Sequence, residues 1–150
     1  MKILLAYDAS RAAGAALEQI LDRPWPAGTK VHVVTVLDLP VAIEPPYEMG
    51  YSAPLFESIL AEQRKASWRH LDSAMEKLKT RKDLTVTHEL REGGGVKREL
   101  LKAIEQWQPD LVFAGFQGKN ALERLFPGSV CHALVNHAPC SIEVVKLPRA

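Results

Sequence analysis

Cysteine is scarce in this chain of 150 residues, and the two that are present do not follow a metal-binding pattern. Cys131 and Cys140 lie near His132 and His137, but the sequence has no C-x2-C or H-x3-H pair of the kind that binds zinc. Adjacent helical residues such as Cys131 and His132 also point about 100° apart. We therefore expect no metal site. We expect packing or surface roles for both cysteines, with redox chemistry as the smaller alternative.

Long apolar runs and an excess of one charge are missing too. The first apolar run, Ile3 to Tyr7, is shorter than the roughly 7 to 15 residues of a secretory signal. No run approaches the about 20 residues of a membrane span. Lys and Arg number 19 against 18 Asp and Glu, a formal net charge of +1. Such a balance creates no strong attraction to nucleic acid or acidic membranes, so we expect a cytoplasmic protein that binds neither.

The motifs of common catalytic sites are also absent. The sequence has no G-x4-G-K-[ST] phosphate loop, no G-x-S-x-G nucleophile turn and no H-E-x-x-H zinc helix. Asp8 and Asp38 are the only carboxylates at the ends of expected strands where a metal could be held for phosphoryl transfer. We predict no catalytic residue, and enzymatic activity stays open at this point.

What the chain does contain is a spaced set of glycines near its C-terminus. Gly115, Gly118, Gly128 and Ser129 form the pattern G-x2-G-x9-G-S directly after the apolar run Leu111 to Ala114. Glycine allows backbone N–H groups to approach an anion closely. Ser129 falls at the expected start of a helix, where the dipole favours negative charge. The pattern predicts a phosphate-binding turn between a strand and a helix.

For Asp8 and Lys119, the sequence leaves open whether the side chain contacts a ligand or only its own turn or loop. Asp8 follows the first strand, and it could hydrogen-bond a ribose or an adenine, or form a turn with Ser10 that caps the first helix. Lys119 could reach a phosphate as a mobile charge or stay solvated in its loop. Gly93 to Gly95 lack the spacing of a phosphate loop, and they predict a flexible turn.

Strand-like and helix-like segments alternate along the whole chain. Apolar, β-branched runs predict strands, and amphipathic stretches with caps or proline stops predict helices. The expected strands are residues 2–7, 31–37, 84–90, 111–114 and 141–146, and the expected helices are 11–21, 52–80, 96 to just before Pro109, and 129–136. This order predicts one α/β domain over residues 1–150, with an open parallel five-stranded sheet and helices on both faces. Strand 84–90 alternates in polarity and is expected at an edge.

The chain resembles the universal stress protein family over nearly its whole length. The resemblance rests on four segments and on the glycine pattern. The segments are Ala6 to Ser10, Val34 to Asp38, Asp110 to Gly115, and His137 to Val145. The pattern G-x2-G-x9-G-[ST] is the signature of the ATP-binding branch of the family, and it is complete here.

The resemblance implies a Rossmann-like sheet of order 3-2-1-4-5, in which the first and fourth strands are neighbours. It implies that the glycine pattern holds the phosphates and ribose of ATP, with or without Mg²⁺ or Mn²⁺. It also implies that Asp8 and the backbone before it contact the ribose and base, beside Val36. The full candidate set is Ala6, Tyr7, Asp8, Val36, Gly115, Gly118, Lys119, Gly128, Ser129 and Val130.

The resemblance further implies a homodimer through the last strand, around Ile142, Val144 and Val145. The chain departs from the family at Tyr7, beside the expected base site, where a smaller residue is usual; this departure bears on affinity and base choice. We expect a dimeric, nucleotide-dependent regulator in the stress response without strong catalysis. A slow ATPase or phosphotransferase using the same site is one alternative, and an interaction module without a ligand is another.

Overall fold

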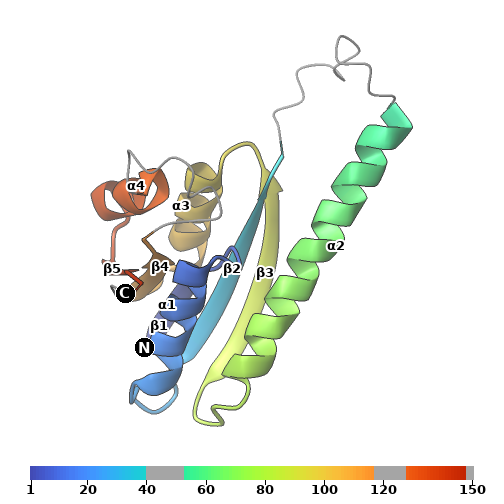
Figure 1. Cartoon of the computed structure of the whole chain (residues 1–150). Coiled ribbons are helices and arrows are strands. Elements are labelled where there is room, and N and C mark those ends of the chain that lie inside the picture. The colour runs from blue at the N-terminus through green and yellow to red at the C-terminus, as the bar shows by residue number, and fades with distance from the viewer. Residues whose placement is uncertain (40–52, 117–127, 148–150) are drawn as a thin grey trace.

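The structure is a computed structural model that describes residues 1–39, 53–116 and 128–147. Five strands alternate with four helices along these residues, as predicted (Figure 1). The strands are β1 (Lys2–Ala6), β2 (Lys30–Asp38), β3 (Thr85–Gly93), β4 (Leu111–Gly115) and β5 (Ser141–Val145). The helices are α1 (Arg11–Asp22), α2 (Ala53–Leu78), α3 (Val96–Trp107) and α4 (Ser129–His137).

The strands form one parallel sheet of order β3-β2-β1-β4-β5, which confirms the expected strand order. β1 lies between β2 and β4, and its Leu5 is in register with Val33 on one side and Phe113 on the other. Because the strands are parallel, their carboxyl ends lie at the same edge of the sheet. The residues that follow β1 and β4 are therefore neighbours, as the predicted site requires.

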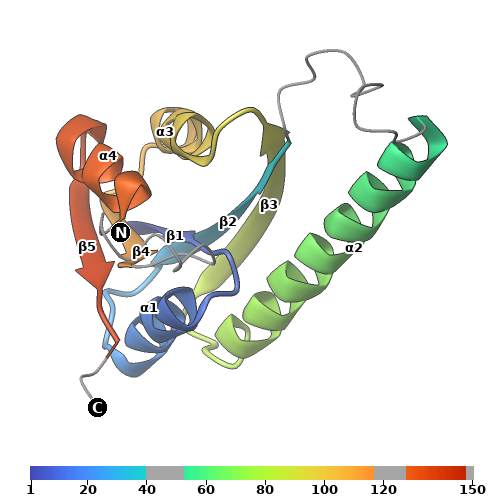
Figure 2. The ribbon, with the colours of Figure 1, turned by 45° about the horizontal axis from the view of Figure 1, so that its top comes forward.

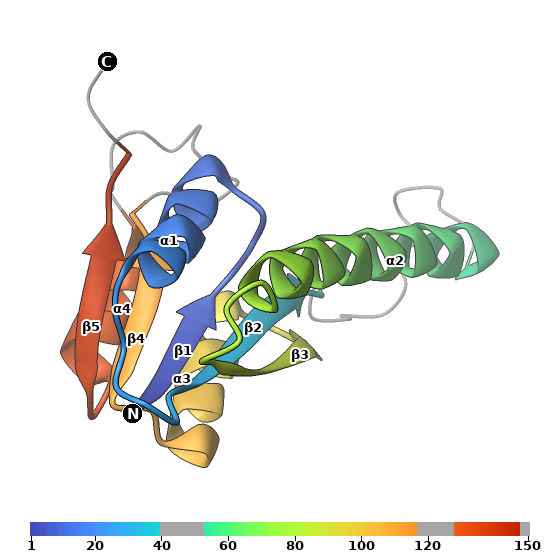
Figure 3. The ribbon, with the colours of Figure 1, turned by 90° about the horizontal axis from the view of Figure 1, so that it is seen from below.

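Two helices cover each face of the sheet, α1 and α2 on one side and α3 and α4 on the other (Figures 2 and 3). Successive side chains of a strand point to opposite faces. Ile3 and Leu5 are buried on the α1 and α2 side, whereas Leu4 is buried on the α3 and α4 side. Full burial of such a side chain contributes about 1.5–3 kcal/mol. The continuous apolar run of β1 thus supports both layers.

The element bounds agree with the sequence prediction to within two residues at every end except one. β3 continues to Gly93 because β2 extends to Asp38 and pairs with it along its whole length. Gly93 is therefore part of a strand, and its assignment to a flexible turn was wrong. A Cβ atom at this position would lie 2.9 Å from the carboxyl group of Glu99, so α3 can pack this closely only against glycine while Glu99 keeps its place.

The helix α2 is longer than the sheet it covers, and its first turns extend past the end of β3 (Figures 1 and 3). Leu71, Met75 and Leu78 in its last turns are buried, whereas Leu55 and Ile59 near its start are exposed. Within the described ranges, no helix has both the length and the apolar character needed to span a lipid bilayer.

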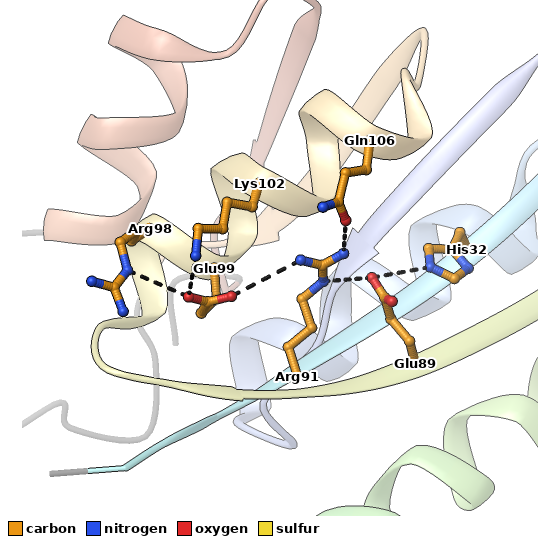
Figure 4. A network of polar contacts seen from close by, with 7 residues as sticks. All are labelled: His32, Glu89, Arg91, Arg98, Glu99, Lys102 and Gln106. Carbon is orange, nitrogen blue, oxygen red and sulfur yellow. Dashed lines mark hydrogen bonds and ion pairs between the residues drawn. The ribbon is translucent and has the colours of Figure 1, made fainter. Parts of the chain in front are cut away.

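A network of polar side chains joins α3 to the strands β2 and β3 (Figure 4). Its members are His32, Glu89, Arg91, Arg98, Glu99, Lys102 and Gln106. The Glu99 carboxylate, largely buried, lies 3.1 Å from Nζ of Lys102 and 3.9 Å from Nη1 of Arg91. The hydrogen bond from Lys102 is the main reason why the pKa of Glu99 lies below its usual value. Arg91 also binds Glu89, so one arginine links two carboxylates on different elements. These contacts fix α3 over the half of the sheet formed by β2 and β3.

Candidate functional site

The candidate site lies where β1 and β4 end side by side. Ala6 and Ala114 are in register on these two strands, so the segment after β1 and Gly115 at the end of β4 lie at the same edge of the sheet. In an open parallel sheet, the order reverses between such strands and ligands bind outside their carboxyl ends. The structure thus brings Asp8 and Gly115 to one place, as predicted.

The turn after β1 is held by its own polar side chains. Asp8 accepts a hydrogen bond from the backbone N–H of Ser10 at 2.9 Å. Ser10 caps α1, since its Oγ accepts from the N–H of Ala13 at 3.1 Å. Ala9 between them has a φ of 61°, a left-handed conformation that is uncommon outside glycine. The turn formed by Asp8 and Ser10 and the cap on the first helix, one of the two predicted alternatives, are therefore both present. The same turn holds a half-buried Asp8 at the edge where β4 ends.

The close packing of α1 against the end of β4 requires glycine at position 115. A Cβ atom there would lie 2.6 Å from the backbone carbon of Ala12 and 2.6 Å from the backbone nitrogen of Ala13. No side chain can occupy that space, because backbone atoms cannot rotate away. The first turn of α1 therefore rests directly on the end of β4. This packing accounts for Gly115 whether or not a phosphate lies nearby.

The first turn of α4 has the features of an anion-binding site. Gly128 precedes the helix with φ 64° and ψ 65°, the left-handed conformation that glycine adopts at little cost. No side chain among the described residues caps this helix. Its first N–H groups lack carbonyl partners within the helix, and together with the helix dipole they attract negative charge. Ser129 is exposed at this end, and Val130 packs against the core on the α3 and α4 side.

Cys131 joins the two glycine-bearing segments. Its thiol donates a hydrogen bond to the carbonyl oxygen of Gly115, with Sγ and O 3.1 Å apart. Burial raises the pKa of this thiol, and the negative charge of Asp8 raises it further. Asp8 follows β1, which pairs with β4, so its carboxylate lies at the same edge of the sheet as Gly115. Gly115 and the first turn of α4 therefore meet at one buried sulfur atom, at the edge of the sheet where Asp8 also lies.

The base side of the predicted site is brought together only in part. Ala6 and Val36 both contact the core on the α3 and α4 side. Tyr7 points to the opposite face, where it packs in the cluster under α1 and α2 and burial raises its pKa. Its backbone N–H donates to the carbonyl of Val34 at 2.9 Å, and its carbonyl accepts from Thr35 Oγ1 at 2.7 Å. The side chain of Tyr7 thus faces away from the side chains of Ala6 and Val36, and its place beside the base remains a prediction.

Asp38 serves a structural contact at the end of β2. One of its carboxylate oxygens accepts from the N–H of Gly95 at 2.8 Å, which ties the start of α3 to that strand. Gly118 and Lys119 lie outside the described residues, so their predicted contacts remain predictions. Across the described residues, no three His, Cys, Asp or Glu side chains are grouped closely enough to hold a metal ion.

Comparison with known proteins identifies the family of this chain. A sequence model of the universal stress protein family matches residues 1–146. The chain belongs to the universal stress protein family. A universal stress protein of Staphylococcus haemolyticus is 28% identical to this family member over 146 residues, which are 96% of this chain and 83% of the relative.

Solved structures of universal stress proteins have the same fold. One from Arabidopsis thaliana, with AMP bound, has a TM-score of 0.69 at 17% identity, and the match covers 99% of this chain and 92% of that one. Another, in complex with cAMP, has a TM-score of 0.63 at 15% identity, and the match covers 97% of this chain and 96% of that one. The five-stranded parallel sheet and its helices are thus the fold of universal stress proteins.

Cys131 packs in the core as expected, and it also makes a contact at the candidate site that the sequence did not predict. A packing or surface role was expected for Cys131, with redox chemistry as the smaller alternative, and the structure adds a hydrogen bond from its thiol to the end of β4. A signal was present, since Cys131 falls in the first turn of the predicted helix 129–136, shortly after the glycine pattern. The spacing alone does not reveal which backbone carbonyl lies opposite.

Proposed function

We propose that this universal stress protein binds ATP at the edge where β1 and β4 end. The observation that carries the proposal is the start of α4: no side chain among the described residues caps it, it follows a left-handed Gly128, and Cys131 ties it to Gly115 at the edge of the sheet where Asp8 lies. Backbone N–H groups at a helix N-terminus are a common phosphate-binding device. The adenine nucleotides in the two solved neighbours support the choice of ligand.

Each part of the site has a distinct role in this proposal. The first N–H groups of α4 and the hydroxyl of Ser129 hold the phosphates, together with the other glycines of the pattern and the charge of Lys119. Asp8 accepts hydrogen bonds from the ribose or from the adenine amino group. The backbone of Ala6 and Tyr7 and the side chain of Val36 lie along the base, whereas Val130 contributes its N–H group to the phosphate-binding turn of α4. Mg²⁺ or Mn²⁺ would enter with the phosphates rather than on a protein cage.

The proposed role is that of a nucleotide-dependent regulator in the stress response without strong catalysis. Phosphoryl transfer needs a positioned water and neutralisation of the developing charge. Asp38, the second carboxylate considered for such a role, is bound to Gly95 instead. Slow ATP hydrolysis at the same site is the second candidate, because Asp8 supplies a carboxylate at the same edge of the sheet.

We also propose that two copies form a homodimer through β5. This strand is an edge of the sheet, and an edge strand exposes backbone groups that can pair with another strand. Its Ile142 and Val144 are half-buried, and its one acidic residue, Glu143, is bound by Arg23 of the same chain. Neutralising Glu143 in this way lowers the repulsion between two copies of the strand.

Calorimetric titration with ATP tests the binding site through a pair of glycine variants. Gly128→Ala places a side chain on a left-handed residue at the site, and its Cβ would lie 3.0 Å from the carbonyl oxygen of Phe116. Gly28→Ala imposes a similar left-handed strain, at φ 77°, in the connection between α1 and β2 at the opposite edge of the sheet. Both should lose about 1 kcal/mol of stability or slightly more.

Only Gly128→Ala should also lose ATP affinity, by about tenfold. Wild-type protein that takes up no ATP at millimolar concentration would refute the proposal. Equal ATP affinities in the two folded variants would move the phosphate site away from α4.

A further inference from the structure

The thiol of Cys131 lies at the junction of the two segments that carry the proposed phosphate site. Its residue is only 7% exposed, and Sγ donates to the carbonyl of Gly115 at 3.1 Å. Gly115 ends β4 whereas Cys131 belongs to the first turn of α4. The hydrogen bond therefore connects the rigid sheet directly to the helix whose N–H groups would meet phosphate.

The surroundings of the thiol are closely packed. A Cβ atom at Gly128 would lie 3.0 Å from Cβ of Cys131 and 3.4 Å from its Sγ, so the turn before the helix rests on the cysteine. The pKa of the thiol is raised first by burial and then by the charge of Asp8. The group consequently stays protonated at neutral pH and keeps the proton that it donates to Gly115.

We propose that Cys131 is a positioning residue for the phosphates of the nucleotide. The thiol holds the first turn of α4 against the end of β4, so that the N–H groups of Ser129 and Val130 keep a fixed direction. Cys131 itself does not touch the nucleotide. This inference rests on the proposed binding of ATP, and it adds which part of the ligand depends on the thiol.

In this proposal, different elements of the protein bind the phosphates and the nucleoside. In the proposed site the base and ribose contact Ala6, Asp8 and Val36, which are supplied by β1, by the turn after it and by β2. Those elements are held by the strand pairing and by the cap on α1, neither of which involves the thiol. Loss of the thiol should therefore weaken the binding of ATP without weakening the binding of adenosine.

The test compares Cys131→Ala, Cys131→Ser and Cys140→Ala in calorimetric titrations with ATP and with adenosine. Cys131→Ala removes one hydrogen bond and should bind ATP about three- to tenfold more weakly, with adenosine affinity unchanged. Cys131→Ser retains a donor and should restore ATP affinity to within about twofold of the wild type. Cys140→Ala, at a half-buried position beyond the other end of α4, is the matched control and should bind ATP like the wild type.

Several outcomes would overturn the inference. Equal ATP affinity in wild type and Cys131→Ala would show that the thiol does not position the helix. A parallel loss of ATP and adenosine affinity would show a general structural defect. A Cys131→Ser protein that binds ATP as weakly as Cys131→Ala would show that the hydrogen bond to Gly115 does not position the helix. Wild-type protein that binds adenosine and ATP equally, or neither, would remove the proposed phosphate site and this inference with it. Thermal unfolding of each variant identifies any that is not folded.

Discussion

The contact of α1 with the end of β4 can be tested by adding one methyl group. Gly115→Ala would place a Cβ atom 2.6 Å from two backbone atoms of α1, at Ala12 and Ala13. Real carbon atoms do not approach so closely, so the helix or the strand must move. Overpacking of this kind costs about 1–3 kcal/mol, and we expect the upper end because backbone atoms lie in the way.

The same substitution elsewhere in the chain provides the control. Gly14 lies inside α1, and a Cβ atom there would meet nothing within 4 Å. Gly14→Ala should therefore stabilise the protein by about 0.5–1 kcal/mol, because alanine favours the helix more than glycine does. The two variants have the same change in composition, so a difference between them reports the packing at Gly115.

Thermal and urea unfolding measure both effects. For a chain of this length, 1 kcal/mol corresponds to about 2–4 °C in the unfolding midpoint. Gly115→Ala should consequently unfold about 6–12 °C below the wild type, and Gly14→Ala a few degrees above it. A Gly115→Ala protein as stable as the wild type would show that α1 does not rest on β4 as described, and the geometry of the site would need revision.

Three further predictions concern pH, assembly and catalysis. Burial lowers the pKa of His32, although Glu89 at 3.4 Å acts in the opposite direction. Below about pH 6.5 the unfolded chain therefore binds more protons than the folded one, so stability should fall as the pH drops from there. His32→Gln should flatten this loss in urea unfolding, with the exposed His132→Gln as control, and an unchanged pH profile would contradict the assignment. Val144→Lys on β5 should shift the sedimentation of the protein from dimer to monomer, and a wild type that is monomeric at tens of micromolar (the range for a modest interface) would oppose the dimer. Asp8→Asn should weaken ATP binding only modestly, and a wild-type turnover above about 1 s⁻¹ that is lost in Asp8→Asn would favour an enzyme.

The order of elements could be predicted from the sequence because each signal is local. Apolar runs such as Ile3 to Tyr7 are read without knowledge of their neighbours, and so are caps such as Ser10. The strand order came from the family resemblance rather than from the residues. The extension of β3 to Gly93 was missed because it depends on the length of β2, the strand with which it pairs.

The site was predicted less completely, because its contacts join distant segments. The glycine pattern indicated Gly115 and Gly128, but the packing of Gly115 against Ala12 depends on how α1 lies over β4. The hydrogen bond from Cys131 to Gly115 has the same origin. The orientation of Tyr7, by contrast, depends only on nearby residues. The alternation of Ile3, Leu5 and Tyr7 along β1 already indicates that all three point to the α1 and α2 side.

The binding of ATP at the start of α4 is tested most directly by following backbone amide signals in an NMR titration of the wild-type protein. Addition of ATP should shift the amide resonances of Ser129 and Val130 most strongly, because their N–H groups would meet the phosphates. Asp8 should follow, and adenosine should shift Asp8 while leaving the start of α4 nearly unchanged. An ATP titration to millimolar concentration that shifts no residue of this group, or only residues on other parts of the surface, would contradict the proposed site.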